Sequence, residues 1–289
     1  MIGASSERGQ GLGGGIEVVL LCPRWGSEGI ELPDFLDRAR AAGFDGVELS
    51  LPDEERPRGA ALEALACSGL AFVGQHHQTL EADFRAHREA YLKRLSALAA
   101  ARPLLVNSQT GRDHFSFEQN LELLERAREL EGKSGVPVVH ETHRGRFSFA
   151  AHATRAYLEA LPWLRLALDV SHWFNVAESW LEDQEEALEL AVNRTDHLHA
   201  RVGFPEGPQV PDPRAPEWRG ALEVHLGVWD RVLRARAREG ARRLSITAEF
   251  GPRPYMPHLP FADTPVADQW EVNRYVKDLL RNRYARPLT

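Results

Sequence analysis

The feature that most constrains the fold is a regular alternation of short apolar segments with longer segments rich in Ala, Leu, Glu and Arg. The apolar segments have the length and composition of β-strands, and the segments between them suit α-helices. Eight candidate strands begin near Ile16, Gly46, Ala71, Leu104, Val136, Leu164, Asp196 and Leu244. Most of them start roughly 30 residues after the previous one, which is the span of one strand-plus-helix unit. The alternation therefore predicts a parallel α/β protein.

Eight such units in 289 residues match the size of a single-domain (β/α)8 barrel, the TIM barrel. We expect the barrel to cover residues 16–289 and the glycine-rich segment 1–15 to be a disordered tail. The longest interval between the starts of two candidate strands contains a Gly- and Pro-rich loop after the seventh strand, from Val202 to Arg219. This loop predicts a lid or a subunit contact. A doubly wound open sheet is the alternative, but the chain reads CPRWG at residues 22–26, where that fold would carry a glycine-rich dinucleotide motif.

Composition excludes some classes of function. The formal net charge of −7 disfavours binding to a nucleic-acid backbone, which depends on Lys and Arg displacing counterions from phosphates. No apolar run approaches the 18 to 20 residues of a membrane span, and no secretory signal is evident. We therefore expect a cytoplasmic protein that acts on a small molecule.

Residues that can bind a metal gather where four consecutive candidate strands end. The segments are Val138–His143, Leu168–His172, His197–Arg201 and Thr247–Phe250. In a parallel barrel the carboxyl ends of the strands form the ligand-binding face. Strand alternation turns Glu141, Asp169, His199 and Glu249 inward together, with Ser171 on the same face as Asp169. Three carboxylates and one imidazole suit a divalent cation such as Mn²⁺, Mg²⁺, Co²⁺ or Zn²⁺.

The alternative for this cluster is an ion-pair network with Arg144, Arg201 and Arg253. Any one of the four residues alone is more often a helix cap or half of an ion pair. Carboxylates inside apolar runs are costly unless they are paired or bound to metal, so three in one barrel mouth favour the cation. A metal there would act as a Lewis acid, so that a carboxylate can remove a proton next to a polarised carbonyl or hydroxyl.

From Ile16 onward the chain resembles the sugar phosphate isomerase/epimerase group of xylose isomerase-like TIM barrels. The resemblance implies that Glu141, Asp169, His199 and Glu249 are the metal ligands. It also implies that Glu141 and Glu249 are the catalytic acid/base pair. The group's D-x-x-H pattern is present at residues 169–172, which implies that His172 binds substrate.

Several further residues are candidates for substrate binding. The resemblance implies that Arg201 holds a substrate oxygen and that Glu48, in a segment similar to the group's second strand, contacts substrate. Other candidates at the strand ends are Asn107, His143, Arg144 and Trp173. Polar strand ends are also ordinary turn residues, and a Trp at a barrel mouth is as often simple packing.

The prediction from these residues is a divalent-metal-dependent sugar or polyol isomerase or epimerase. A sugar lyase or dehydratase of the inosose dehydratase type is the nearest alternative, because it begins with the same deprotonation. A metal phosphodiesterase of the endonuclease IV type is less favoured, since it needs more metal ligands and a basic groove. Homo-oligomers are common in the resembling group, so the resemblance suggests a homo-oligomer here as well.

Overall fold

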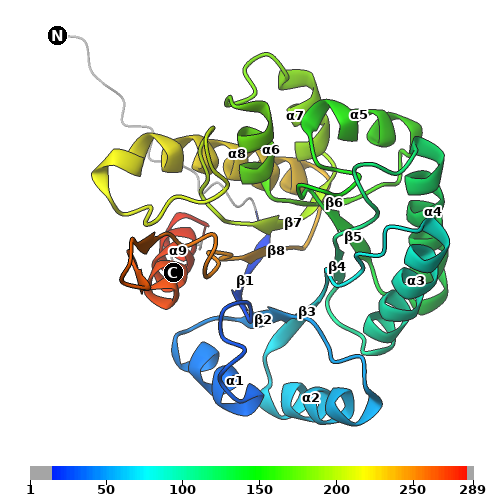
Figure 1. Ribbon diagram of the computed structural model, residues 1–289, viewed down its shortest axis with the longest axis horizontal. Helices are drawn as coiled ribbons and strands as arrows, with labels where there is room; N and C mark the ends of the chain where they lie inside the picture. The colour runs from blue at the N-terminus through cyan, green and yellow to red at the C-terminus, as the bar shows by residue number, and fades with distance from the viewer. Residues whose placement is uncertain (1–14, 285–289) are drawn as a thin grey trace.

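A computed structural model describes residues 15–284 and shows a closed barrel of eight parallel strands ringed by helices (Figure 1). The strands are β1 Glu17–Pro23, β2 Gly46–Leu49, β3 Ala71–His76, β4 Val106–Ser108, β5 Val138–Glu141, β6 Leu166–Leu168, β7 Thr195–His199 and β8 Arg243–Thr247. They pair in chain order, and β1 closes the barrel against β8. The predicted (β/α)8 fold is therefore confirmed. The tail expected for residues 1–15 lies, apart from Gly15, outside the described residues.

Helices follow the strands and cover the outside of the barrel (Figure 1). They are α1 Leu32–Ala41, α2 Glu55–Ser68, α3 Phe84–Ala100, α4 Phe117–Ser134, α5 Ala151–Ala160, α6 Val170–Ala177, α7 Glu185–Val192, α8 Arg219–Arg238 and α9 Gln269–Tyr284. The main core lies between these helices and the outer face of the sheet. Among the described residues no helix is long and apolar enough to cross a membrane.

The interior of the barrel changes from apolar to polar along its axis. A small apolar cluster fills the end where the strands begin, and it includes Leu21, Val73 and Val139. Further along the strands the inward residues are polar, and Asn107 and His199 are fully buried there. Because inward side chains of neighbouring strands stack in layers, this change places buried polar groups directly below the mouth of the barrel.

The strand predicted to continue through Ser171 ends earlier than expected. Strand β6 stops at Leu168, and α6 begins at Val170. The Asp169 carboxylate caps this helix by accepting a hydrogen bond from the Ser171 backbone N–H at 3.0 Å. Asp169 thus combines a strand end with an N-cap, and His172 lies in the first turn of a helix instead of on a strand.

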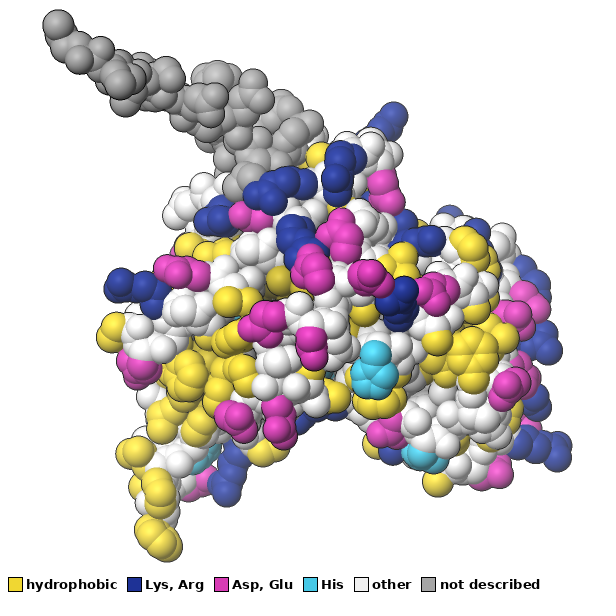
Figure 2. All heavy atoms as spheres, turned by 90° about the horizontal axis from the view of Figure 1, so that it is seen from above, with side chains coloured by type: hydrophobic (Ala, Val, Ile, Leu, Met, Phe, Trp, Pro, Cys, Tyr) yellow, Lys and Arg dark blue, Asp and Glu magenta, His cyan; other side chains and the backbone are white. Residues whose placement is uncertain are grey.

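Between β8 and α9 the chain forms a small hairpin of β9 His258–Leu259 and β10 Thr264–Pro265. Leu259 and Phe261 on this hairpin are exposed. On the face shown in Figure 2, acidic and basic side chains are intermixed, and no wide stripe of basic residues runs across it.

Candidate metal centre

The four predicted metal ligands come together at the mouth of the barrel. Glu141 and His199 are the last residues of β5 and β7, whereas Asp169 directly follows β6 and Glu249 lies two residues after the end of β8. One ligand atom from each residue lies within 4.8 Å of the others, and all four side chains are buried. Donor atoms on opposite sides of a small divalent cation are about 4 Å apart, so the cluster has a size suited to one ion.

His199 is held so that one ring nitrogen faces this cluster. Its Nε2 lies 3.1 Å from both carboxylate oxygens of Glu48, which can only accept, so Nε2 carries the hydrogen. Its Nδ1 lies 2.7 Å from Glu249 Oε2 and 3.7 Å from Glu141 Oε1, yet it forms no hydrogen bond with any described residue. A ring nitrogen that faces two carboxylates needs either a proton or a cation between it and them, and a metal ion would take the place of that proton. The donor set therefore fits a metal.

The pKa values of the cluster are shifted, because its titratable groups are buried close together. Burial raises the pKa of Glu141 to about 8, and the nearby carboxylates act in the same direction. Burial also raises the pKa of Asp169, although Arg201 opposes it. Burial acts to lower the pKa of His199, but the carboxylates of Glu249, Glu48 and Glu141 raise it well above its usual range. A divalent cation would stabilise these buried carboxylates in their charged form.

The ion-pair alternative accounts for only part of the cluster. Arg201 pairs with Asp169, and its Nη1 lies 4.0 Å from Glu249. Arg144 instead donates to His172 Nδ1 at 3.1 Å and to Asn175 Oδ1 at 2.9 Å. Arg253 pairs with Asp263 on the exposed hairpin. Of the three arginines, Arg201 alone therefore pairs with a carboxylate of the cluster.

The cluster forms the floor of a cavity of about 490 Å³. Glu141, Glu249, Arg201 and His143 line it, together with polar groups of the β3 and β4 ends. Gln109 donates from Nε2 to both oxygens of Glu141 at 3.2 Å. The cavity thus combines two metal-ligand carboxylates with groups that can bind hydroxyls.

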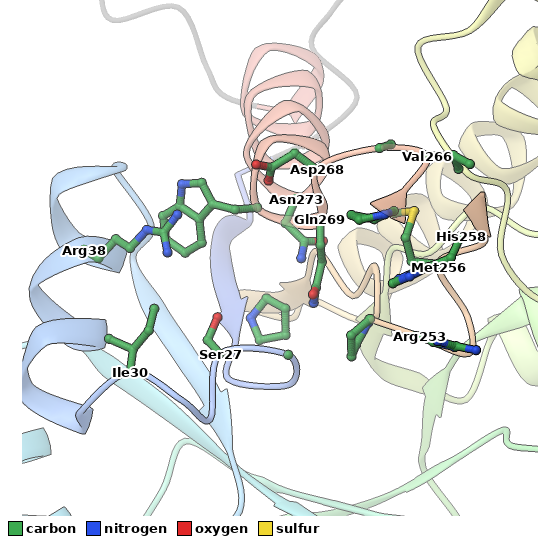
Figure 3. A pocket seen from close by; sticks show the side chains of 16 residues that line it. Ser27, Ile30, Arg38, Arg253, Met256, His258, Val266, Asp268, Gln269 and Asn273 are labelled. Carbon is green, nitrogen blue, oxygen red and sulfur yellow. The ribbon is translucent and has the colours of Figure 1, made fainter. Parts of the chain in front are cut away.

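A larger cavity of about 630 Å³ lies beside α1 and the start of α9 (Figure 3). Arg38, Met256 and Asn273 are among its lining residues. None of the predicted site residues lines it within the described chain. We therefore place the chemistry in the smaller cavity, where the buried carboxylates are.

Several predicted substrate contacts lie elsewhere. Glu48 is buried below His199 and is held there by Asn107 Nδ2 at 2.8 Å, so neither residue lines the cavity. The imidazoles of His199 and His197 hold the pKa of Glu48 well below its usual range, although burial acts to raise it. Trp173 is fully buried and donates to the Ser148 carbonyl at 2.8 Å, so it packs in the core and does not reach the cavity.

His172 is also buried behind the cavity wall. Its Nδ1 and Nε2 lie 3.1 Å and 2.6 Å from nitrogens of Arg144 and Arg201. Of the predicted substrate-binding residues, only His143 and Arg201 line the cavity.

Further residues also line the cavity. Gln75 is the penultimate residue of β3 and Gln109 directly follows β4, and Gln75 donates to Glu249 Oε1 at 3.3 Å. Trp25 and Tyr255 form an edge-to-face aromatic pair, with ring centroids 5.1 Å apart, on another wall. Trp25 lies two residues after the end of β1, as Glu249 does after β8, so the rule that found the metal ligands would have found it. Tyr255 lies deeper in a loop and carries no such signal.

Comparison with known proteins agrees with this geometry. Residues 36–206 match the model of the xylose isomerase-like TIM barrel family. No curated protein gives a significant match.

Among solved structures, 3-keto-D-glucoside 4-epimerase YcjR from E. coli is 12% identical, with a TM-score of 0.59 over 92% of this chain and 100% of that one. The probable 3-DHS dehydratase AsbF from Bacillus anthracis is 17% identical, with a TM-score of 0.54 and the same coverage. A xylose isomerase-like TIM barrel protein from Mycobacterium smegmatis in complex with magnesium is 11% identical, with a TM-score of 0.58 over 92% and 98% of the two chains. At these identities the structures show a shared fold, and the family match shows that this chain belongs to the xylose isomerase-like TIM barrel family.

Proposed function

We propose that the protein is a divalent-metal-dependent isomerase or epimerase that moves a proton next to the carbonyl of a sugar or polyol. The observation that carries the proposal is a buried cluster of the size of one cation, in which His199 Nδ1 lies 2.7 Å from Glu249 Oε2 and 3.7 Å from Glu141 Oε1. This arrangement lies at the floor of a cavity large enough for a sugar.

Glu141, Asp169, His199 and Glu249 would hold the ion. A bound divalent ion would supply Lewis-acid polarisation of a substrate carbonyl and would thereby acidify the neighbouring C–H. Mn²⁺, Mg²⁺, Co²⁺ and Zn²⁺ are all compatible with three carboxylates and one imidazole.

The acid/base pair that we propose is Glu141 and Glu249. Both carboxylates line the cavity, whereas Asp169 is paired with Arg201. One carboxylate would take the proton from carbon, and the other would return it on the opposite face of the substrate or at the neighbouring carbon. Gln109 and Gln75 donate to these carboxylates and so fix the oxygens that move the proton.

The remaining walls would orient the substrate and limit water. His143 donates from Nδ1 to the Arg144 carbonyl at 2.6 Å, which leaves Nε2 as an acceptor for a substrate hydroxyl. Arg201 lies at the cavity wall, where it can hold a substrate oxygen. Trp25 and Tyr255 form an apolar wall that suits the C–H face of a sugar ring.

A dehydratase is the second candidate, because the same proton removal followed by loss of water from the adjacent carbon gives elimination. The two solved structures with named activities carry one name from each class, an epimerase and a probable dehydratase. The mass of the product separates the two reactions, since isomerisation conserves mass and dehydration removes one water.

A multinuclear phosphodiesterase fits the structure less well. It would require further metal ligands. His143 lies in a second group of possible ligands with Glu141 and His172, but other spare histidines have other partners. His76 contacts Ser108 and Thr79, and His197 contacts Ser245. The net charge of −7 and the intermixed charges in Figure 2 also disfavour DNA as a substrate.

The experiment that tests the proposal begins with elemental mass spectrometry of the purified protein after reconstitution with each candidate metal. We expect one ion per chain, and we expect Glu141→Gln and Asp169→Asn to lose it. Glu28→Gln is the matched control, because Glu28 lines the same cavity but lies outside the ligand cluster. Two or three zinc ions per chain would favour phosphodiester hydrolysis, and no bound metal would refute the mechanism.

Activity is then measured by NMR in D₂O on ketoses, inososes and their phosphates. Proton transfer at carbon exchanges a C–H for deuterium even when no net conversion occurs. We expect this exchange to be lost in Glu141→Gln and Glu249→Gln and retained in Glu28→Gln.

A further inference from the structure

The backbone that follows Glu249 is fixed by side-chain amides from two distant parts of the chain. Strand β8 ends at Thr247, so Phe250 and Gly251 lie beyond the ladder of the sheet. The Gly251 N–H donates to Gln209 Oε1 at 2.8 Å, and Gln209 Nε2 donates back to the Gly251 carbonyl at 3.1 Å. Gln209 belongs to the long loop after β7. Its side-chain amide makes the two hydrogen bonds to Gly251 that the backbone of a neighbouring strand would otherwise make.

Helix α9 supplies the other two amides. The Phe250 N–H donates to Asn273 Oδ1 at 2.8 Å, and Asn273 Nδ2 donates to the Phe250 carbonyl at 3.0 Å. Gln269 Nε2 donates to the same carbonyl and to the Trp25 carbonyl, both at 2.8 Å. Figure 3 shows Gln269 and Asn273 leaving the start of α9 close together.

The side-chain amides of Gln209 and Asn273 lie at buried positions, where an amide needs hydrogen-bond partners. Gln209 is 5% exposed and Asn273 is 3% exposed. A buried amide without partners is destabilising, whereas each of these amides bonds its oxygen to the N–H and its nitrogen to the C=O of one backbone residue. The long loop is therefore not a free lid in this region, because Gln209 and its neighbour Val210 are packed into the protein.

The same backbone also sets the aromatic wall of the cavity. A Cβ atom at Gly251 would lie 2.1 Å from the ring of Trp25, so the absence of a side chain lets that ring pack against the backbone. The Trp25 ring then meets Tyr255. Any shift of the peptide between Phe250 and Gly251 would therefore move a metal ligand on one side and the cavity wall on the other.

We propose that Gln209, Gln269 and Asn273 form an amide brace that positions Glu249 for metal binding and Trp25 for substrate binding. They are positioning residues, since they act through the backbone of Phe250 and Gly251. The metal-binding part rests on the proposed function, whereas the bracing of the backbone does not.

The bracing is tested by hydrogen–deuterium exchange of peptides that span residues 244–256, measured by mass spectrometry without metal. We expect Gln209→Ala to speed exchange of the Gly251 amide by about tenfold or more. Gln209→Glu keeps the oxygen that accepts from this amide and removes only the donor to the Gly251 carbonyl, so exchange should stay slow. The matched control is Glu206→Ala, an exposed residue of the same loop.

The positioning of Glu249 is tested by Mn²⁺ titration followed by calorimetry, and by the shift in Tm that Mn²⁺ produces. We expect Gln209→Ala and Asn273→Ala to weaken Mn²⁺ binding by about tenfold or more and to reduce the Mn²⁺-induced shift in Tm. A merely structural role would lower the Tm with and without Mn²⁺ equally and leave the shift unchanged. For Gln269→Ala we expect greater quenching of Trp25 fluorescence by acrylamide, measured against a Trp25→Phe background.

Two results would overturn the brace. One is a rate of hydrogen–deuterium exchange of residues 244–256 in Gln209→Ala that equals the rate in the wild type. The other is faster exchange with unchanged Mn²⁺ affinity, which would show that the backbone does not position Glu249. If the wild-type protein itself binds no Mn²⁺, the proposed function fails, and the exchange result alone then decides whether the brace exists.

Discussion

At the scale of single residues, His199 connects the core of the barrel to its mouth. Its Nε2 binds Glu48 below, and its Nδ1 faces Glu249 and Glu141 above. A carboxylate behind a metal-binding imidazole fixes the tautomer and raises the basicity of the nitrogen that faces the metal. Glu48 is thus placed to support a metal ligand, where the resemblance had implied a substrate contact.

We therefore predict that Glu48→Gln weakens Mn²⁺ binding by about 10- to 100-fold, because a neutral amide no longer fixes and polarises His199. Isothermal calorimetry with the metal-free protein measures the affinity. Glu28→Gln should bind Mn²⁺ as the wild type does. Equal affinities of the Glu48→Gln variant and the wild type would show that this carboxylate has no part in the metal centre.

Trp173 illustrates a residue whose environment decides its role. It is fully buried, and its indole N–H donates to the carbonyl of Ser148. We predict that Trp173→Phe lowers the free energy of unfolding by about 1–3 kcal/mol, because the buried carbonyl loses its donor. Denaturation by urea measures this change. A raised KM with unchanged stability would instead support the stacking role considered from the sequence.

At the scale of elements, two glycines with opposite surroundings test the packing of strands and helices. A Cβ at Gly46 in β2 would lie 2.3 Å from the carbonyl oxygen of Ala71, whereas a Cβ at Gly59 in α2 would meet no described atom within 4 Å. We predict that Gly46→Ala destabilises the protein by about 1–3 kcal/mol through overpacking. Gly59→Ala should stabilise it by about 0.5–1 kcal/mol, because alanine restricts the unfolded chain. Thermal unfolding of both variants would contradict this account if their Tm values shifted in the same direction.

The sequence predicts where the helices and strands lie better than it predicts how far below the barrel mouth an inward side chain lies. Strand starts are found within about two residues because the alternation of apolar and helical segments repeats through the chain. Alternation also gives the inward direction of Asn107 and Glu141. It does not give their height, which depends on register: Asn107 pairs with Val139, two residues before Glu141, and so lies one layer lower.

The roles of residues in loops are not predicted from the sequence for a related reason. Tyr255 reaches the cavity from a loop of irregular conformation, and Gln209 reaches Gly251 across 42 positions. Neither belongs to a periodic pattern, so only tertiary contacts reveal their roles.

At the scale of the whole molecule, the metal ligands join the ends of four consecutive strands, so metal binding and global stability are linked. We predict that Mn²⁺ at 100 times its Kd raises the free energy of unfolding by about 2.7 kcal/mol, provided that the unfolded chain does not bind it. Urea denaturation with and without EDTA measures this difference. Asp169→Asn should show no such difference, and a wild type equally stable in both conditions would argue against a metal centre.

The stability of the whole molecule should also fall in mild acid because of histidines that are buried in the neutral form. His225 on α8 donates from Nδ1 to the Ala221 carbonyl at 2.8 Å and accepts at Nε2 from the Gly203 N–H at 3.1 Å. Burial lowers the pKa of His225 from 6.5 to about 4, and Arg201 acts in the same direction.

The folded state thus binds fewer protons than the unfolded state between pH 6.5 and 4, so the stability contributed by neutral His225 is present above pH 6.5 and is lost as the pH falls. The shift from 6.5 to about 4 corresponds to about 3 kcal/mol over this range. Urea titrations at a series of pH values measure the slope, and His225→Gln should flatten it while His152→Gln, at an exposed position, should not. An unchanged slope in His225→Gln would show that other groups control the acid sensitivity.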